Sequence, residues 1–481
     1  MILEALQADR RPSLKLPKTF LAEALATGRL AGPLVLTQLA SMVIGTTDVL
    51  FLGHLGPDAL AAGALGLSLY YMPMMFGFGL SSALSPQLAQ AVGADPHGLN
   101  PALRRLSTTE ELRTHFRTGM WAIGLAALFA ILVLQFAHPV FGLLGQDKAI
   151  SDTAALYILA MLPGLPFSLL IGVMRNLFAS LSQPRPALIV TLVWIGVNAL
   201  FNWIFIFGHF GFPAMGVMGS GIATSCATIL GAAVMAAWVA LHPATRPLRP
   251  FHGILRFEPA RAWKFARLGM PIGLTLFFEG AVFNVALWLV GMFSPAQLAG
   301  HQIAINIASV TFQVPLGVAF ATTVRVGYAA GARDWDAVRR SGQVGMVLSF
   351  LAMAVTAFVM WTWPLELAGL YLDPDDPASH QAIAFAVQFL AIAAIFQIAD
   401  GQQVSAAFSL RGLKDTSVPM WVAGFSYWVI GFPTCVALGF GLGLQGQGVW
   451  IGLAFGLAAA AVLMTWRFEY LTRRHKLGAE A

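Results

Sequence analysis

The sequence contains twelve stretches that are long and apolar enough to cross a lipid bilayer as helices. A membrane helix needs about 20 mostly apolar residues, because the hydrocarbon core is about 30 Å thick and each residue advances about 1.5 Å. Hydrophobic residues make up 58% of the chain and charged residues only 10%, which excludes an ordinary globule in water. We predict an all-α membrane protein with twelve transmembrane helices, at 30–52, 60–92, 118–138, 152–174, 187–208, 217–241, 267–293, 298–330, 342–364, 380–409, 417–439 and 447–468.

The basic residues segregate to one side of the predicted membrane. If both termini are cytoplasmic, every Lys and Arg except Lys148 lies in a tail or an inner connection, as the positive-inside rule requires. The net charge of +6 is therefore explained by topology, and we expect no nucleic-acid partner. No secretory signal pattern precedes the first predicted helix.

The two halves of the chain resemble each other when they are shifted by 238 residues. The shift pairs Pro33, Thr37, Gly53, Pro57, Gly79 and Gly93 with Pro271, Thr275, Gly291, Pro295, Gly317 and Gly331. A GxxGxG pattern also recurs in the last helix of each half, at 216–221 and 443–448. Each half holds six helices, so the repeats run parallel and are related by an axis along the membrane normal, where transporters place their sites.

This repeat predicts the domain organisation. We expect two six-helix lobes related by a parallel pseudo-two-fold repeat, at 30–241 and 267–468. The basic stretch 242–266 would link them in the cytoplasm, and the segments 1–29 and 469–481 would be cytoplasmic tails.

Three carboxylic acids lie inside predicted spans: Asp48, Glu279 and Asp400. A charge at bilayer depth costs at least about 2.5–3.5 kcal/mol, so such residues usually face a cavity and serve ions or protons. No Lys or Arg is predicted deep in a span to neutralise them. The alternative is a protonated acid that only forms a hydrogen bond with a neighbouring backbone group or amide. This alternative could explain one of the three acids more easily than all three together.

Neutral polar residues in the spans are weaker candidates, since membrane helices often use them only as interhelical hydrogen bonds. Asn198 and Asn202 lie four apart on one helix face. The other supporting candidates for an ion or substrate site are Asn284, Gln397 and Gln402. His301 begins a helix near the outer surface, which favours an interfacial role.

Several other functions are disfavoured by the motifs. The glycine triplets follow no strand, so close helix packing explains them better than dinucleotide binding. The chain has no Walker motif and no local hydrolase signature, so we expect neither ATP as a partner nor enzyme activity, and no cofactor beyond a coupling ion. Cys226 and Cys435 fall in apolar stretches of opposite halves, which argues against a disulfide framework.

Five segments carry a resemblance to a known family. They are GTTDVLFLG (45–53), NALFNWIFIFGHFG (198–211), GMPIGLTLFFEGAVF (269–283), GHQIAINIASVTFQVPLGVAFATTVRVGYAAG (300–331) and IFQIADGQQVSAAFSLRGLKD (395–415). In this order and spacing the chain resembles, from Gly32 to Trp466, the multidrug and toxic compound extrusion (MATE) family in its bacterial NorM-like branch.

The resemblance implies an antiporter of the bacterial inner membrane that expels small organic cations or drugs in exchange for H⁺ or Na⁺ by alternating access. It would act as a monomer, with membrane lipid as its surroundings. Residues like Glu279 and Asp400 would hold Na⁺ in the second lobe, and Asp48 beside Asn198 and Asn202 would form a protonation-linked site in the first.

One departure from the family pattern bears on the coupling ion. Relatives often carry Tyr four residues before the tenth-helix acid, and this chain has Phe396 there. One oxygen ligand is therefore missing, which leaves coupling to H⁺, or to Na⁺ completed by Gln or water, as alternatives. The runner-up function is a flippase for lipid-linked precursors of the same wider superfamily, which acidic-only cavities would disfavour.

Overall fold

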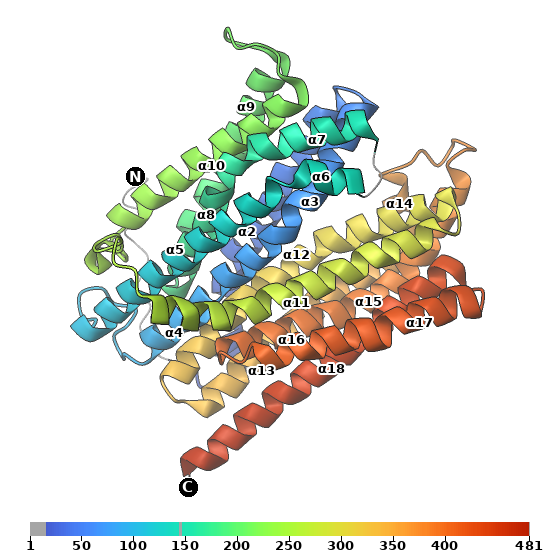
Figure 1. Cartoon of the computed structure of the whole chain (residues 1–481). Helices are drawn as coiled ribbons and strands as arrows, with labels where there is room; N and C mark the ends of the chain where they lie inside the picture. The colour runs from blue at the N-terminus through green and yellow to red at the C-terminus, as the bar shows by residue number, and fades with distance from the viewer. Residues whose placement is uncertain (1–15, 144–146, 481) are drawn as a thin grey trace.

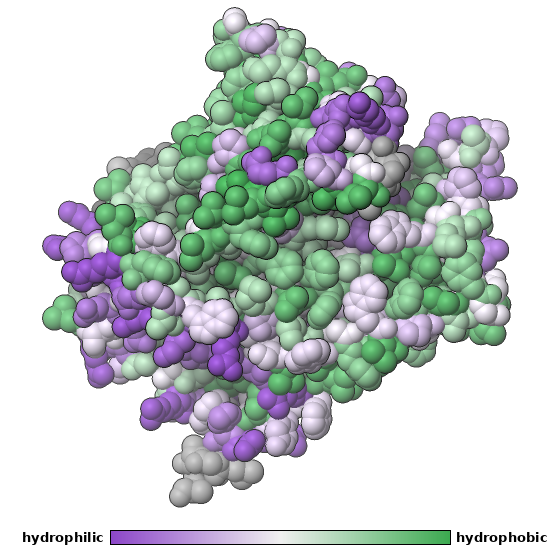
Figure 2. All heavy atoms as spheres, in the orientation of Figure 1, coloured by the Kyte–Doolittle hydropathy of each residue, from purple (hydrophilic) through white to green (hydrophobic). Residues whose placement is uncertain are grey.

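The computed structural model describes residues 16–143 and 147–480, and it folds this part of the chain into helices without any strand. Twelve of the described segments are long and apolar enough to cross a membrane, and each overlaps one of the twelve predicted spans. Figure 2 shows the matching surface, with an apolar band between more polar ends. The chain is thus an all-helical, multi-pass membrane protein.

The first six spans are α2 (Phe20–Gly53), α3–α4 (Pro57–Ser82 and Leu84–Gly93), α5 (Leu106–Leu134), α7–α8 (Lys148–Met161 and Leu165–Ser180), α9 (Arg185–Phe207) and α10 (Gly216–Leu241). The next six are α11 (Pro259–Gly291), α12 (Pro295–Gly331), α13 (Trp335–Thr362), α15 (His380–Gly412), α16–α17 (Ser417–Phe425 and Phe432–Val436) and α18 (Gln445–Glu480). Short helices α6 (Ala137–Leu143) and α14 (Pro364–Gly369) lie in connections. In Figure 1 the two sets lie side by side.

The helices extend beyond the predicted spans at the end of the bundle where α2 begins and α18 ends, called the basic end below. The helix α2 begins at Phe20 rather than near residue 30, and α5 begins at Leu106 rather than near 118. Hydropathy windows stop at the first charges, whereas a helix continues wherever its charged side chains find partners or water. Glu23, which lies in the stretch 1–29 predicted as a tail, is therefore part of α2.

The repeat is visible in the local chemistry of the helices. Pro57 and Pro295, which the 238-residue shift pairs, each begin a helix, where the missing N–H costs nothing. Pro33 and Pro271 each lie inside a helix. One turn later the Thr37 hydroxyl donates to the Pro33 carbonyl at 2.6 Å, and the Thr275 hydroxyl donates to that of Pro271 at 2.8 Å.

The repeat is also visible in contacts between the halves, at glycines where an added Cβ would collide with the other half. Gly79 lies against Gly273, and Gly317 lies against Val35. Because the shift pairs 79 with 317 and 35 with 273, these are two copies of one contact. Exchanging the two halves converts one contact into the other, which is the property of an interface with two-fold symmetry.

The same exchange occurs nearer the basic end. Gly93 lies against Tyr328, and Gly331 lies against Gln90, and the shift of 238 again converts one pair into the other. Gly327 lies against Ala89, its own repeat equivalent. The pseudo-two-fold axis therefore passes between Ala89 and Gly327, which agrees with the parallel repeat predicted from sequence.

Buried apolar residues form two clusters. The first draws almost entirely on α2 to α10, with contributions from α11 and α12, and the second draws on α11 to α18. We call α2–α10 the first lobe and α11–α18 the second. The exact boundaries at 30–241 and 267–468 stay a proposal, since helix packing alone does not fix a domain limit.

Candidate functional site

Asp48 lies in the interior of the first lobe, on α2, and is 4% exposed. Its Oδ1 accepts a hydrogen bond from Asn202 Nδ2 at 2.7 Å, and its Oδ2 accepts one from the Thr224 hydroxyl at 3.1 Å. Asn202 Nδ2 also donates to the Asn198 carbonyl at 3.0 Å. The structure thus brings together Asp48 and the asparagine pair that the sequence placed near it.

Packing at glycine positions the third helix of this cluster. Gly219 of α10 lies so close to the Phe205 carbonyl of α9 that any side chain would collide. This contact brings Thr224, little more than one turn further along α10, beside Asn198 and Asn202. Sequence reasoning missed Thr224, because a threonine in an apolar helix carries no signal of its own.

The first-lobe cluster contains polar groups whose charge or hydrogen-bonding capacity is not fully used. Within the described residues no Lys, Arg or His forms an ion pair with Asp48, and the buried Asn202 Oδ1 has no hydrogen-bond donor. A buried carboxylate and a free amide oxygen can together accept a proton or a small organic cation. Tyr71 of α3 also lies within electrostatic range of Asp48 and is 44% exposed.

Glu279 on α11 and Asp400 on α15 lie within electrostatic range of each other in the second lobe. Glu279 is partly buried, whereas Asp400 is 6% exposed and its Oδ1 has no hydrogen-bond partner. The two acids that the sequence assigned to this lobe therefore lie near enough to influence each other electrostatically, although no hydrogen bond joins them in the described part of the chain.

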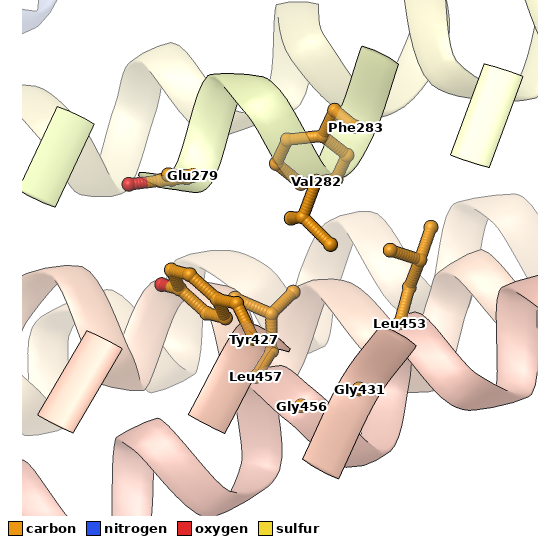
Figure 3. Close-up of a pocket in the computed structure, with 8 residues that line it drawn as sticks. All are labelled: Glu279, Val282, Phe283, Tyr427, Gly431, Leu453, Gly456 and Leu457. Atoms are coloured by element: carbon orange, nitrogen blue, oxygen red, sulfur yellow. The ribbon is translucent and has the colours of Figure 1, made fainter. Parts of the chain in front are cut away.

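A cavity of about 10 Å³ lies between Glu279, the turn Ser426–Gly431 and the helix α18, which is room for about one water molecule. Figure 3 shows the Glu279 carboxylate and the Tyr427 hydroxyl on the same side of this cavity. Tyr427 lies in a π-helical turn, Ser426–Gly431, that interrupts the eleventh span, and such turns are frequent at functional sites. Its buried hydroxyl also has no hydrogen-bond partner.

Arg411 corrects the expectation that no basic side chain accompanies the acids. The helix α15 continues to Gly412, three residues beyond the predicted end, and Arg411 is 6% exposed. Its guanidinium lies 3.9 Å from the Phe408 ring centroid, within electrostatic range of Glu279. Because a basic side chain lies near the acids, the expected lack of basic groups no longer argues against an anionic lipid substrate. The choice between an antiporter and a lipid flippase therefore depends on similarity to known proteins.

Three supporting candidates lie in ordinary packing positions. Gln397 accepts from the Thr311 hydroxyl at 3.0 Å and donates to the Met353 carbonyl at 3.4 Å. Asn284 is exposed and donates to Gly280 of its own helix. Gln402 is partly buried. The side-chain oxygen of Gln397 thus already accepts a hydrogen bond from the neighbouring helix α12.

Phe396 and His301 belong to an aromatic cluster beside the second-lobe cavity. Phe396 packs edge-on against Phe283, which lines the cavity, and against Trp450. His301 is 1% exposed, with its ring 5.4 Å from that of Trp450, so the expectation of an interfacial histidine was wrong. Beside the two acids, Phe396 thus offers a ring edge in place of an oxygen.

The two lobes are joined by polar contacts at the basic end. Glu23, 1% exposed at the start of α2, accepts from Arg325 Nε at 2.9 Å and Nη2 at 2.6 Å, and from the Ser341 hydroxyl at 2.8 Å. The Gln90 amide donates to the Gly412 carbonyl at 2.8 Å. Every hydrogen bond between the lobes within the described ranges lies in this half of the bundle.

Comparison with known proteins gives one consistent family. The MatE family model matches residues 33–204 and 271–437. A probable multidrug resistance protein NorM of Mesorhizobium japonicum is 43% identical over 450 residues, which cover 93% of each chain. The multidrug resistance protein NorM of Burkholderia vietnamiensis is 36% identical over 95% of this chain and 96% of that protein.

Solved structures agree in fold. The eukaryotic MATE transporter AtDTX14 superposes with a TM-score of 0.82 over 95% of this chain and 98% of that one, at 20% identity. A mutant of the Vibrio cholerae MATE transporter VcmN gives a TM-score of 0.83 over 95% and 98%, at 18% identity. These likenesses support the twelve-helix architecture.

Proposed function

Because the chain belongs to the MatE family, we propose that it is a multidrug efflux antiporter that exports cationic or amphipathic organic compounds in exchange for protons. The observation that carries the proposal is the buried carboxyl group of Asp48, which is hydrogen-bonded by Asn202 and Thr224 and forms no ion pair with a basic residue in the described part of the chain. Such a group is costly to keep charged in a membrane unless a cation or a proton compensates it.

The first-lobe cluster performs the exchange by competition. The Asp48 carboxylate attracts an organic cation, and the free Asn202 Oδ1 accepts a hydrogen bond from a substrate that can donate one. When a proton binds to Asp48, the negative charge disappears and the cation loses its partner. One carboxyl group therefore cannot hold both, and that exclusion is the chemical requirement for antiport.

The second-lobe acids supply a further coupling position. The cavity of about 10 Å³ beside Glu279 is too small for an organic compound, so Glu279, under the electrostatic influence of Asp400, would hold only a proton, a water molecule or a small ion. Proton coupling is favoured because Phe396 lacks an oxygen and Gln397 has committed its own. In the described part of the chain, moreover, no three Asp, Glu, His or Cys side chains gather into a metal-binding group.

Alternating access fits the distribution of contacts between the lobes. The hydrogen bonds that join them lie at the basic end, which the positive-inside rule assigns to the cytoplasm. We propose an inner-membrane protein with both termini in the cytoplasm, in an outward-facing arrangement closed on that side. Each monomer contains both lobes and would transport alone.

The direct test is transport into proteoliposomes with a pH gradient or a Na⁺ gradient imposed separately. We expect uptake of a fluorescent organic cation, such as ethidium, to follow the pH gradient in Na⁺-free buffer. Liposomes without protein serve as the control. Uptake that requires Na⁺ would contradict proton coupling, and absence of uptake under either gradient would contradict the antiporter itself.

We expect Glu279→Gln and Asp400→Asn to impair transport each by itself, with the double variant little worse than the poorer single variant. Two interacting carboxyl groups titrate as a pair, so losing either removes the shared site. Transport rates of the three variants under the same pH gradient give the comparison, with Glu366→Gln, at an exposed position of α14, as the control. Additive losses would indicate two independent sites.

A further inference from the structure

The connection between α10 and α11 is a folded element at the basic end, held against the first lobe. The Thr245 hydroxyl donates to the Val239 carbonyl at 2.7 Å. From α5, Arg113 Nε donates to the Leu248 carbonyl and Trp121 Nε1 to the Ile254 carbonyl, both at 2.6 Å. These bonds join distant segments, so residues 245–254 have a defined shape.

This connection encloses an open cavity of about 570 Å³, which has no part in the proposed transport cycle. Its charged and polar lining comes from Arg246, Arg249 and His252, and Ala240 contributes from the last turn of α10. Arg249 has a φ of 44° and precedes the buried Pro250. A left-handed arginine is a strained backbone state that its surroundings must maintain, so the position of Arg249 is imposed by the fold.

The basic side chains of the cavity have no acidic partner among the residues that the structure describes. Glu258 is the sole acid between residues 242 and 266, and it is bound by Arg117 of α5 and by Arg261. Within the ranges that the structure describes, Arg246 and Arg249 form no ion pair, although both are exposed. The positive charges of these two arginines at one cavity could therefore be compensated by a bound anion.

The neighbourhood of the cavity is that of a membrane interface. Leu241, which ends α10 next to Ala240, is 74% exposed; further along the chain, Leu255 is 87% exposed and Trp263, in the first turns of α11, is 72% exposed. Exposed aliphatic and Trp side chains beside arginines are typical of the headgroup level of a bilayer. A soluble anion would gain nothing from these apolar groups, whereas acyl chains would cover them.

We propose that this cavity binds the phosphate-bearing headgroup of an anionic phospholipid from the cytoplasmic leaflet. The phosphate lies between the guanidinium groups of Arg246 and Arg249, which match phosphate oxygens in charge and geometry. His252 offers a further hydrogen-bonding group, and the acyl chains lie along Leu241. The proposal depends on the orientation in the membrane and is independent of the transported compound and the coupling ion.

The test uses the full-length protein in detergent, titrated with phosphatidylglycerol or phosphatidylcholine, with retained lipid measured by native mass spectrometry. We expect phosphatidylglycerol to be retained preferentially. The double variant Arg246→Gln with Arg249→Gln should bind it roughly 30-fold more weakly, since each basic residue near an anionic lipid surface contributes about fivefold. A matched control, Arg105→Gln with Arg333→Gln, removes the same charge from exposed positions elsewhere at the basic end.

Three outcomes would overturn the proposal. Equal weakening in the control variant would mean that charge at the basic end acts diffusely, without a site. Equal retention of phosphatidylglycerol and phosphatidylcholine would mean that the headgroup charge is not recognised. If inorganic phosphate alone displaced the lipid at millimolar concentration and protected the protein equally from thermal unfolding, the site would belong to a soluble anion.

Discussion

Replacing Asp48 by Asn should abolish drug efflux while leaving the protein folded in the membrane. Asn has nearly the shape of Asp: its single side-chain oxygen can accept the hydrogen bond from Asn202, and its NH2 group can donate to the Thr224 hydroxyl, which reverses the direction of that bond. It cannot carry a negative charge or take up a proton, so the exchange at the first-lobe cluster stops. We expect uptake of an organic cation by proteoliposomes to fall to the level of liposomes without protein.

The matched control for this prediction is Asp58→Asn, which removes an exposed acid from the first turn of α3. It should transport like the unmodified protein. Thermal unfolding in detergent should show both variants folded. If Asp48→Asn retained full transport at equal expression, the charge of Asp48 would be dispensable and the proposed exchange mechanism would fail.

Breaking the ion pair between Glu23 and Arg325 should open the cytoplasmic side of the protein. Removing one partner of a buried pair leaves an unpaired buried charge, which costs about 3–5 kcal/mol. Glu23→Gln would impose that cost only on the state in which the lobes are closed at the basic end. The balance of conformations should therefore shift by roughly 100-fold or more towards the inward-open state, since about 1.4 kcal/mol is tenfold.

The shift can be measured by thiol labelling. Ala89→Cys introduces a thiol beside Gly327 at the interface between the lobes, in a background in which Cys226 and Cys435 are replaced by Ala. We expect a membrane-impermeant maleimide, applied to inside-out vesicles, to label this cysteine much faster in Glu23→Gln.

Two further variants make the result specific to the ion pair. Glu110→Gln removes an exposed acid at the same end of the bundle and should leave the labelling rate unchanged. The exchange of partners, Glu23→Arg with Arg325→Glu, should restore slow labelling at least in part. If Glu23→Gln labelled at the rate of the unmodified pair, the ion pair would not be a gate.

Part of the first-lobe cluster could be predicted from sequence. An acid inside an apolar span is conspicuous because its burial is costly, and two asparagines four apart must share a helix face. Thr224 could not be found in this way, because threonine is ordinary in membrane helices and only the contact of Gly219 with Phe205 brings it to Asp48.

The second lobe shows the same limit more sharply. Glu279 and Asp400 were identified by their charge, but Tyr427 was not, because its place depends on a π-helical turn without a local signature. Arg411 was misplaced because hydropathy ends a span at the first charge, whereas here the guanidinium is accommodated over the ring of Phe408. Glu23 was left outside the first predicted span because it is charged. Its partner Arg325 lies 302 residues away in the sequence, so no local pattern shows that this charge is paired.

The sequence by itself determined the twelve spans, their charge asymmetry and the parallel repeat. Hydropathy over about 20 residues and identity at a constant offset are properties of the chain, and a bilayer leaves helices as the only way for such segments to satisfy their backbone. The tertiary structure alone decided how each helix is rotated and which side chains converge. That outcome depends on close contacts between distant segments, such as Gly79 with Gly273 and Gly317 with Val35, and no local stretch of sequence contains both partners.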